Sequence, residues 1–241
     1  MDRWSPDDGV DRVLVVTAHP DDVDFGAAGT VATFTDAAVD VAYCVVTDGD
    51  AGGSDRTQSR ADMAAVRRDE QRAAAAVVGV TDVTFLGYPD GRLAPTLELR
   101  RDISRVIRRF RPQRVLAQSP DRNWDRLFAS HPDHLAAGEA AACAVYPDAR
   151  NPFAHPDLLD EGLEPHTVDQ LWLMAFPTPT VYVDTTDAFD RKVAALRAHR
   201  SQLSGDMDVE KLLREWSSGV ANAAGLPDGR LAEAFRVVQT A

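Results

Sequence analysis

Short apolar runs alternate with longer segments of helical periodicity along the first half of the chain. Residues 13–17 and 39–47 are continuous, valine-rich runs, which are typical of strands buried on both faces of a parallel sheet. Residues 27–35 and 59–78 carry apolar side chains at helical spacing, and Gly79 ends the second segment as a C-cap. This alternation of strands and helices predicts a parallel sheet flanked by helices.

The same kind of pattern continues towards the C-terminus. We expect further strands at residues 83–86, 114–118, 170–176 and 181–184, and further helices at residues 97–110, 133–145, 187–203, 209–216 and 231–238. Pro177 and Pro179 mark the turn between the last two strands. The predicted fold class is therefore α/β, with a Rossmann-like, mostly parallel sheet flanked by helices and with a C-terminal strand pair and helices.

Length and composition fit one domain over residues 1–241, because 241 residues of which 44% are hydrophobic can bury a substantial core. A net charge of −12 argues against nucleic acid or an anionic membrane as a partner, since it repels polyanions. The chain has no secretory signal and no apolar run of membrane-spanning length, so we expect a cytoplasmic protein. Cys44 and Cys143 lie in apolar patterns typical of reduced, buried thiols. The oligomeric state stays open.

A His-Pro-Asp-Asp cluster directly follows the first predicted strand, and a His-Pro-Asp-His cluster follows the fourth. His19 and Asp22 are close enough in sequence to reach one point from a tight turn, and His134 supplies a third donor. Two imidazoles and one carboxylate with a fourth position open are typical of catalytic zinc, although ferrous iron suits the same donors. Asp21 would lie beside the metal, where it could act as general base on a water that the metal activates.

Each cluster alone is equally consistent with a helix N-terminus, where Pro and Asp are common without any metal. A third His-Pro-Asp sequence begins at His155, follows no predicted strand and has Leu158 where a ligand would be needed, so we assign it to a turn or cap. The first two clusters, at the same edge of one predicted sheet, favour a metal site. The alternative is a non-catalytic Rossmann-like module that binds a sugar or nucleotide at the small-residue segment 26–29.

The order of motifs resembles the PIG-L / LmbE-like family of zinc-dependent N-acetylglucosaminyl deacetylases. The motifs that carry the resemblance lie between residues 13 and 145, and a softer similarity covers 192–202. In chain order they are AHPDD, TDG, an RxxE that begins at Arg67, LGYPDG, the RP before the fourth strand, and HPDH. The resemblance implies a small amino-sugar conjugate as substrate and hydrolysis of its N-acetyl or related N-acyl group.

Carried over by position, the resemblance implies zinc bound by His19, Asp22 and His134, with Asp21 as base. It implies that His131 polarises the amide carbonyl, stabilises the oxyanion and protonates the leaving amine, and that Asp133 orients His131. It also implies that Arg67 contacts the substrate.

Two departures from the family pattern concern the substrate and the surroundings of the site. Asp24 stands where many members have glutamate, and residues 128–130 lack the tyrosine found in some sugar-thiol deacetylases. An amidase acting on thiol-sugar conjugates is therefore a further alternative. The long segment 119–130, with Trp124 as either a lid or a hydrophobic plug, is expected to shape the substrate site.

Overall fold

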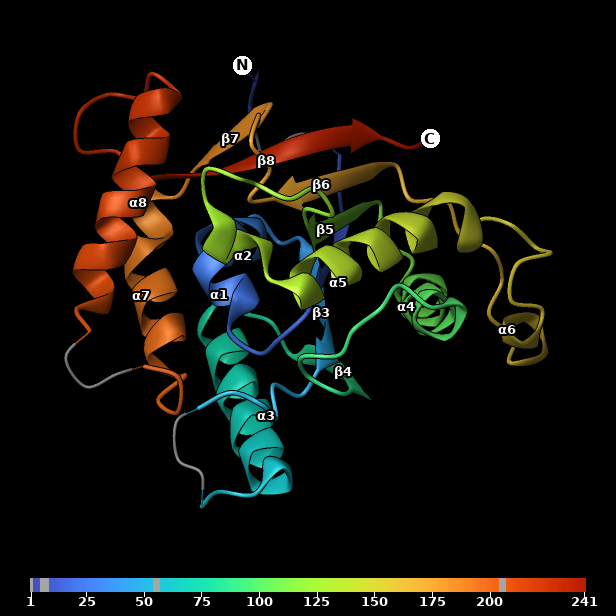
Figure 1. Ribbon diagram of the computed structural model, residues 1–241. Coiled ribbons are helices and arrows are strands. Elements are labelled where there is room, and N and C mark those ends of the chain that lie inside the picture. Colours follow the sequence, from blue (N-terminus) through green and yellow to red (C-terminus); the bar gives the residue numbers. More distant parts are fainter. Residues whose placement is uncertain (1, 5–8, 54–56, 204–206) are drawn as a thin grey trace.

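The computed structural model describes residues 2–4, 9–53, 57–203 and 207–241, and within them eight strands form one sheet (Figure 1). The strand order is β1-β7-β8-β6-β5-β2-β3-β4. The bounds are β1 (Asp2–Arg3), β2 (Arg12–Thr17), β3 (Asp40–Thr47), β4 (Asp82–Tyr88), β5 (Arg114–Gln118), β6 (Gln170–Met174), β7 (Val181–Asp184) and β8 (Ala232–Gln239). The expected mostly parallel sheet is confirmed, since every neighbouring pair except the two that involve β8 is parallel.

Helices cover both faces of this sheet. The helices are α1 (Asp22–Gly26), α2 (Ala28–Asp36), α3 (Arg60–Val77), α4 (Leu97–Phe110), α5 (Pro132–Cys143), α6 (Asp157–Asp160), α7 (Phe189–Arg197) and α8 (Val209–Ala223), with short helical turns at Leu127–Ser130, Ala144–Asp148 and Thr186–Ala188. No helix in the described ranges combines the length and the apolar character that crossing a membrane requires.

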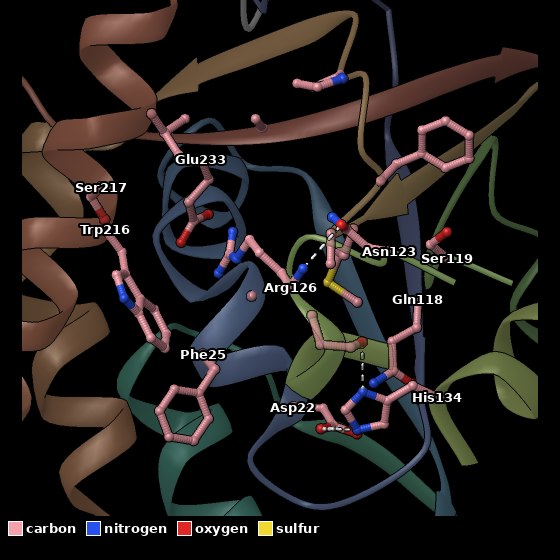
Figure 2. Close-up of a pocket in the computed structure, with 18 of the residues that line it drawn as sticks. Asp22, Phe25, Gln118, Ser119, Asn123, Arg126, His134, Trp216, Ser217 and Glu233 are labelled. Carbon is pink, nitrogen blue, oxygen red and sulfur yellow. Dashed lines mark hydrogen bonds and ion pairs between the residues drawn. The ribbon is translucent and has the colours of Figure 1, made fainter. Parts of the chain in front are cut away.

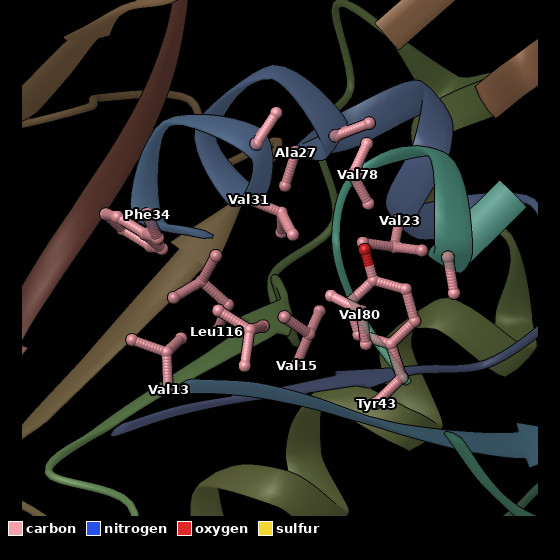
Figure 3. Close-up of a cluster of buried hydrophobic side chains, with 14 of the residues drawn as sticks. Val13, Val15, Val23, Ala27, Val31, Phe34, Tyr43, Val78, Val80 and Leu116 are labelled. Carbon is pink, nitrogen blue, oxygen red and sulfur yellow. The ribbon is translucent and has the colours of Figure 1, made fainter. Parts of the chain in front are cut away.

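Alternate residues of β2 build the two halves of the core, because successive side chains in a strand point to opposite faces. Val13 and Val15 pack with residues of α1, α2 and α3, as Figure 3 shows. Leu14 and Val16 pack with residues of α4 and α5 on the opposite face. A smaller cluster joins α7 to α8 beside the sheet. The carboxyl end of β2 is therefore held rigidly between two packed layers.

The prediction of a helix over residues 231–238 is wrong, because this segment forms β8. The strands expected at residues 170–176 and 181–184 correspond to β6 and β7, and β8 lies between them, antiparallel to both. Leu231, Ala232 and Glu233 favour a helix locally, but the open backbone groups of β6 and β7 provide a ladder that overrides this preference. The β-branched pair Val237 and Val238 was the sequence signal for a strand.

β8 also places the buried carboxylate of Glu233 at the start of α2. Glu233 accepts hydrogen bonds from the backbone N–H groups of Gly29 and Thr30, at 3.1 and 2.7 Å, where the helix dipole favours a negative charge. Lys192 of α7 donates to the same carboxylate and to the carbonyl oxygen of Phe25. Lys192 and Glu233 are almost completely buried, so this ion pair ties α7 and β8 to the α1–α2 junction.

Replacing Lys192 by methionine is expected to lower the free energy of unfolding by about 3–5 kcal/mol, because it leaves the Glu233 carboxylate buried without its cation. Chemical denaturation measures the loss. Arg214→Met is the matched control, since Arg214 pairs with Glu210 on the surface, where such a pair contributes about 1 kcal/mol or less. Equal losses in the two variants would contradict the assignment of Lys192 as the buried partner.

Candidate metal centre and active site

The turn between β2 and α1 carries three polar side chains at the carboxyl edge of the sheet. His19 and Asp21 lie in the turn and Asp22 begins α1. Asp21 has a left-handed backbone conformation with φ of +95°, which is uncommon for a residue with a side chain. Its N–H donates to Gln71 Oε1 at 2.8 Å, and its carbonyl oxygen accepts from Asp24 N and Phe25 N. A strained residue that is fixed on both sides is typical of a functional turn.

The second cluster, residues 131–134, lies at the start of α5, which follows β5. Because β5 lies beside β2 and parallel to it, the residues after both strands meet at one edge of the sheet. Gly138 brings α5 close to that edge, since a Cβ atom at this position would lie 2.3 Å from the carbonyl oxygen of Gln118. The imidazole rings of His19, His131 and His134 consequently lie together, with ring centroids 5.1 to 5.4 Å apart.

The Asp22 carboxylate lies between two of these imidazoles. Asp22 Oδ1 lies 3.0 Å from Nε2 of His134, and Oδ2 lies 3.3 Å from Nδ1 of His19. Burial raises the pKa of the Asp22 carboxyl, but His134 and His19 outweigh burial and hold this pKa well below its usual range. The structure thus brings the predicted set of His19, Asp22 and His134 together, with the carboxylate in its ionised form.

His19 faces two further carboxylates with its other ring nitrogen. Nε2 lies 3.1 Å from Asp90 Oδ1 and 3.3 Å from Asp133 Oδ2. Burial lowers the pKa of His19, but Asp22, Asp133 and Asp90 together outweigh it and raise the pKa to about 12. This concentration of negative charge around buried imidazoles favours binding of a cation. Nitrogen and carboxylate donors in this combination fit a divalent ion such as zinc.

Ligand atoms within 4.8 Å of one another define two candidate groups among the described residues: His19 with His131 and His134, and His19 with Asp90 and Asp133. Asp90 has no role among the sequence predictions, although it lies in the LGYPDG motif. Its position in a Pro-Asp-Gly turn directly after a strand was the signal that could have identified it. Asp90 and Asp133 lie on the Nε2 side of His19, as expected of carboxylates that orient a metal-binding histidine.

His131 is oriented differently from the sequence expectation. Its Nδ1 accepts a hydrogen bond from the backbone N–H of Asp133 at 3.2 Å, whereas the Asp133 carboxylate accepts from Gly91 N and Leu93 N and contacts His19. Burial lowers the pKa of His131, and the neighbouring His19 and His134 lower it further. A neutral His131 with Nδ1 as acceptor carries its proton on Nε2, which is then available as a donor.

Arg67 lies under the turn and is only 4% exposed. Its guanidinium donates to the carbonyl oxygens of Gly49 and Pro20 and to Asp21 Oδ2, the last at 3.1 Å. The structure therefore places Arg67 against the predicted base, while its Nε has no partner among the described residues, and its contact with substrate stays a prediction. Glu70, the last residue of the RxxE motif, accepts hydrogen bonds from Ser201 and forms no ion pair with Arg67 among the described residues.

Asp21 itself lines a cavity together with Asp22 and His134. Burial raises the pKa of the Asp21 carboxyl to about 7, and the adjacent charge of Asp22 contributes in the same direction, while Arg67, His199 and His19 oppose the shift. A pKa near neutrality is typical of a general base.

A buried network supports this turn from behind. Gln71, which accepts from Asp21 N, donates to Asp24 Oδ2 at 2.9 Å, and the same oxygen lies 2.8 Å from Nε2 of His199. Asp24 and His199 are fully buried. Asp24 thus joins α1 to α3 and to the segment after α7, which explains why a carboxylate stands at this position even though it does not face the cavity.

The cavity beside the site has a volume of about 580 Å³ and is lined by several elements that are distant in sequence (Figure 2). Asp22 and His134 lie at one end, and Phe25, Phe128 and Trp216 form an aromatic wall. Part of the long segment 119–130 lines the cavity, as the sequence suggested. Trp124 is 80% exposed and stacks against Arg122, so it is not a hydrophobic plug.

Comparison with known proteins gives consistent results for sequence and fold. Residues 14–145 match the PIG-L family, described as GlcNAc-PI de-N-acetylase. The chain is 34% identical over 238 residues to the diacetylchitobiose deacetylase of Thermococcus kodakarensis, a match that covers 97% of this chain and 85% of that protein. It is 30% identical over 216 residues to a probable N-acetyl-alpha-D-glucosaminyl L-malate deacetylase 2 of Bacillus anthracis, covering 87% and 88% of the two chains.

A solved structure extends the similarity to the whole chain. The structure of N,N'-diacetylchitobiose deacetylase from Pyrococcus horikoshii, in complex with an inhibitor, superposes with a TM-score of 0.90 at 32% identity. The superposition covers 99% of this chain and 87% of that one. The relatives named here are deacetylases of conjugates that contain N-acetylglucosamine.

Proposed function

This chain belongs to the PIG-L family, and from that premise we propose that it hydrolyses the N-acetyl group of a conjugate that contains N-acetylglucosamine. The observation that carries the proposal is the position of Asp22 between His19 and His134, next to Asp21, at one end of a cavity large enough for a sugar. A deacetylation site needs donors for a cation, a base and room for an amino sugar, and these residues and the cavity supply all three.

We assign the cation site to His19, Asp22 and His134, and zinc is the ion that their donor atoms favour. When bound there, zinc supplies a Lewis acid that polarises the acetamide carbonyl and lowers the pKa of water towards neutrality. Ferrous iron has a similar preference for two histidines and one carboxylate. Elemental analysis of protein prepared without oxygen distinguishes the two metals.

Asp21 is the general base in this mechanism. It accepts a proton from the water that attacks the carbonyl carbon and returns this proton to the nitrogen of the departing amine, a transfer that the family resemblance assigned to His131. Burial raises the pKa of the Asp21 carboxyl, and a cation beside Asp22 would lower this pKa and favour the ionised form that a base needs. Arg67 holds the Asp21 carboxylate by a 3.1 Å hydrogen bond, and we assign it as a positioning residue.

His131 is the donor to the developing oxyanion. Its Nδ1 is occupied by the Asp133 N–H, so its Nε2–H is free to bind the carbonyl oxygen as negative charge accumulates there. The lowered pKa keeps the ring neutral, which preserves this tautomer. The backbone N–H of Asp133 donates to His131 Nδ1, and the Asp133 carboxylate contacts His19 Nε2.

The direct test is release of acetate from N,N'-diacetylchitobiose by the purified protein loaded with zinc. We expect acetate and a free amine in equal amounts, loss of activity after exhaustive chelation, and recovery on adding zinc. Full activity after chelation, with metal content shown to be zero, would contradict the proposed metal-dependent chemistry. The same assay with thiol-sugar conjugates tests the other substrate class.

Asp90→Asn is expected to weaken zinc binding by about 10- to 100-fold, because the Asp90 carboxylate contacts Nε2 of His19 and so orients the imidazole ring. Competition with a chromophoric chelator measures the affinity. Asp102→Asn is a suitable control, since Asp102 binds Tyr88 and the arginines of α4 instead of a site histidine. Unchanged zinc affinity in Asp90→Asn would show that Asp90 does not support the metal ligand.

A further inference from the structure

Arg126 lies in the cavity wall with an unusual set of neighbours. Its guanidinium carbon is 5.2 Å from the ring centre of Phe128 and 5.8 Å from that of Trp216. These two rings stack on each other, with centroids 6.2 Å apart and planes inclined by 22°. Arg126 and Phe128 come from the segment after β5, whereas Trp216 comes from α8. Two segments that are distant in sequence, the one after β5 and helix α8, therefore each contribute an aromatic ring that contacts Arg126.

The Arg126 guanidinium has no hydrogen bond or ion pair with any residue in the described ranges, although its backbone N–H bonds to Asn123. Aromatic rings contact the face of a guanidinium and leave the N–H groups at its edge available. The other charged groups along this cavity are already engaged, since Lys192 pairs with Glu233 and His134 pairs with Asp22. Arg126 is thus an exposed cation at the cavity wall, in contact with two aromatic rings, whose guanidinium donors have no partner among the described residues.

The position of Arg126 relates it to the substrate. Figure 2 shows Arg126 in the same cavity as Asp22 and His134, on the side towards Trp216. Arg126, Phe128 and Trp216 also line a second cavity of about 510 Å³, which continues between α8 and the strands β7 and β8. A substrate whose acetamide lies at Asp22 and His134, and whose attached group extends towards Trp216, would pass Arg126 on the way to the second cavity.

We propose that Arg126 binds an anionic group, either a carboxylate or a phosphate, on the part of the substrate that is attached to the amino sugar. This inference rests on the proposed deacetylase function and deepens it by naming a specificity residue. A guanidinium offers paired donors that match both anions, and contact with aromatic rings limits its orientations and so reduces the entropy lost on binding. Arg126 touches the substrate at a distance from the bond that breaks, so it acts through substrate binding.

The test uses three glycosides of N-acetylglucosamine that differ only in the charge of the attached group: a neutral amide, a carboxylate and a phosphate. For the zinc-loaded protein we expect kcat/KM to be about 10- to 100-fold higher for at least one of the two anionic glycosides than for the neutral one, mainly through KM. Arg126→Met keeps the apolar packing and is expected to remove this preference, so that kcat/KM becomes equal for the three glycosides.

Arg214→Met is the matched control, because Arg214 also lies over an aromatic ring, that of Phe189, but lines neither cavity. It is expected to retain the preference. Equal kcat/KM for the three glycosides in the unsubstituted protein, or an anionic preference that persists in Arg126→Met, overturns the inference and leaves the deacetylase function intact.

Binding of the corresponding free amino sugars, measured by calorimetry, tests the anion site at Arg126 separately from the proposed deacetylase function. If the zinc-loaded protein hydrolyses none of the three glycosides, the deacetylase function fails. Tighter binding of the anionic amino sugars, lost in Arg126→Met, still supports an anion site at Arg126. Equal binding of charged and neutral sugars overturns that site regardless of hydrolysis.

Discussion

Asp21→Asn is expected to lower kcat for acetate release by about 10²- to 10⁴-fold, the contribution of a well-placed general base. The amide keeps the shape of the carboxylate and its contact with Arg67, but it cannot accept a proton from water. Proton transfer from water to Asp21 occurs only during the reaction, so kcat and kcat/KM are expected to fall together. Steady-state kinetics with zinc-saturated protein measures both parameters.

Two observations keep the Asp21 test specific. Zinc content is expected to stay at its original level, since Asp21 lies next to the assigned ligands but is not one of them. Asp69→Asn controls for loss of one negative charge, because Asp69 lies on α3 and its side chain is 82% exposed. Activity of Asp21→Asn within a few fold of the original would assign the base to another group.

His134→Ala is expected to remove both zinc binding and activity. It deletes one of the two proposed imidazole ligands and leaves Asp22 with a single histidine partner. With free zinc at about 1,000 times the dissociation constant, the original protein gains about 4 kcal/mol of stability from binding, and the variant is expected to lose most of this gain. Acetate release is expected to fall by at least about 10³-fold, because the Lewis acid provides several kcal/mol of transition-state stabilisation. Thermal unfolding with and without zinc, and the acetate assay, measure the two effects.

The chain contains a matched control for this substitution. His155 begins the third His-Pro-Asp tripeptide, but its Nε2 lies 3.3 Å from Asp148, outside the histidine cluster. His155→Ala is expected to keep the zinc-dependent rise in unfolding temperature. If His134→Ala keeps that rise as well, His134 is not a ligand.

The local pattern of the sequence was sufficient to predict most of the parallel sheet. β2, β3 and β5 are buried on both faces and therefore appear as continuous apolar runs, which need no knowledge of their neighbours. β8 was not predicted because its conformation depends on pairing with β6 and β7, which are distant in sequence. Long-range backbone pairing overrides the local helical preference of residues 231–238.

The approach of His19 and His134 could be anticipated, since both follow parallel strands and such strands end at the same edge of a sheet. The contacts that the side chains of Asp133 and Arg67 make could not be anticipated from the sequence. Their side chains reach His19 and Asp21 through rotamers and neighbouring loops that the sequence pattern does not specify. The convergence of Arg126 with Trp216 depends on how α8 packs against the loop after β5, which is equally a property of the folded chain.

The most direct test of the metal centre is anomalous diffraction at the zinc absorption edge from crystals of the zinc-loaded protein. We predict one strong peak within about 2.0–2.2 Å of a nitrogen of His19, a nitrogen of His134 and an oxygen of Asp22. A peak among His19, Asp90 and Asp133 instead, or no peak at this edge of the sheet with zinc in excess, would contradict the central claim.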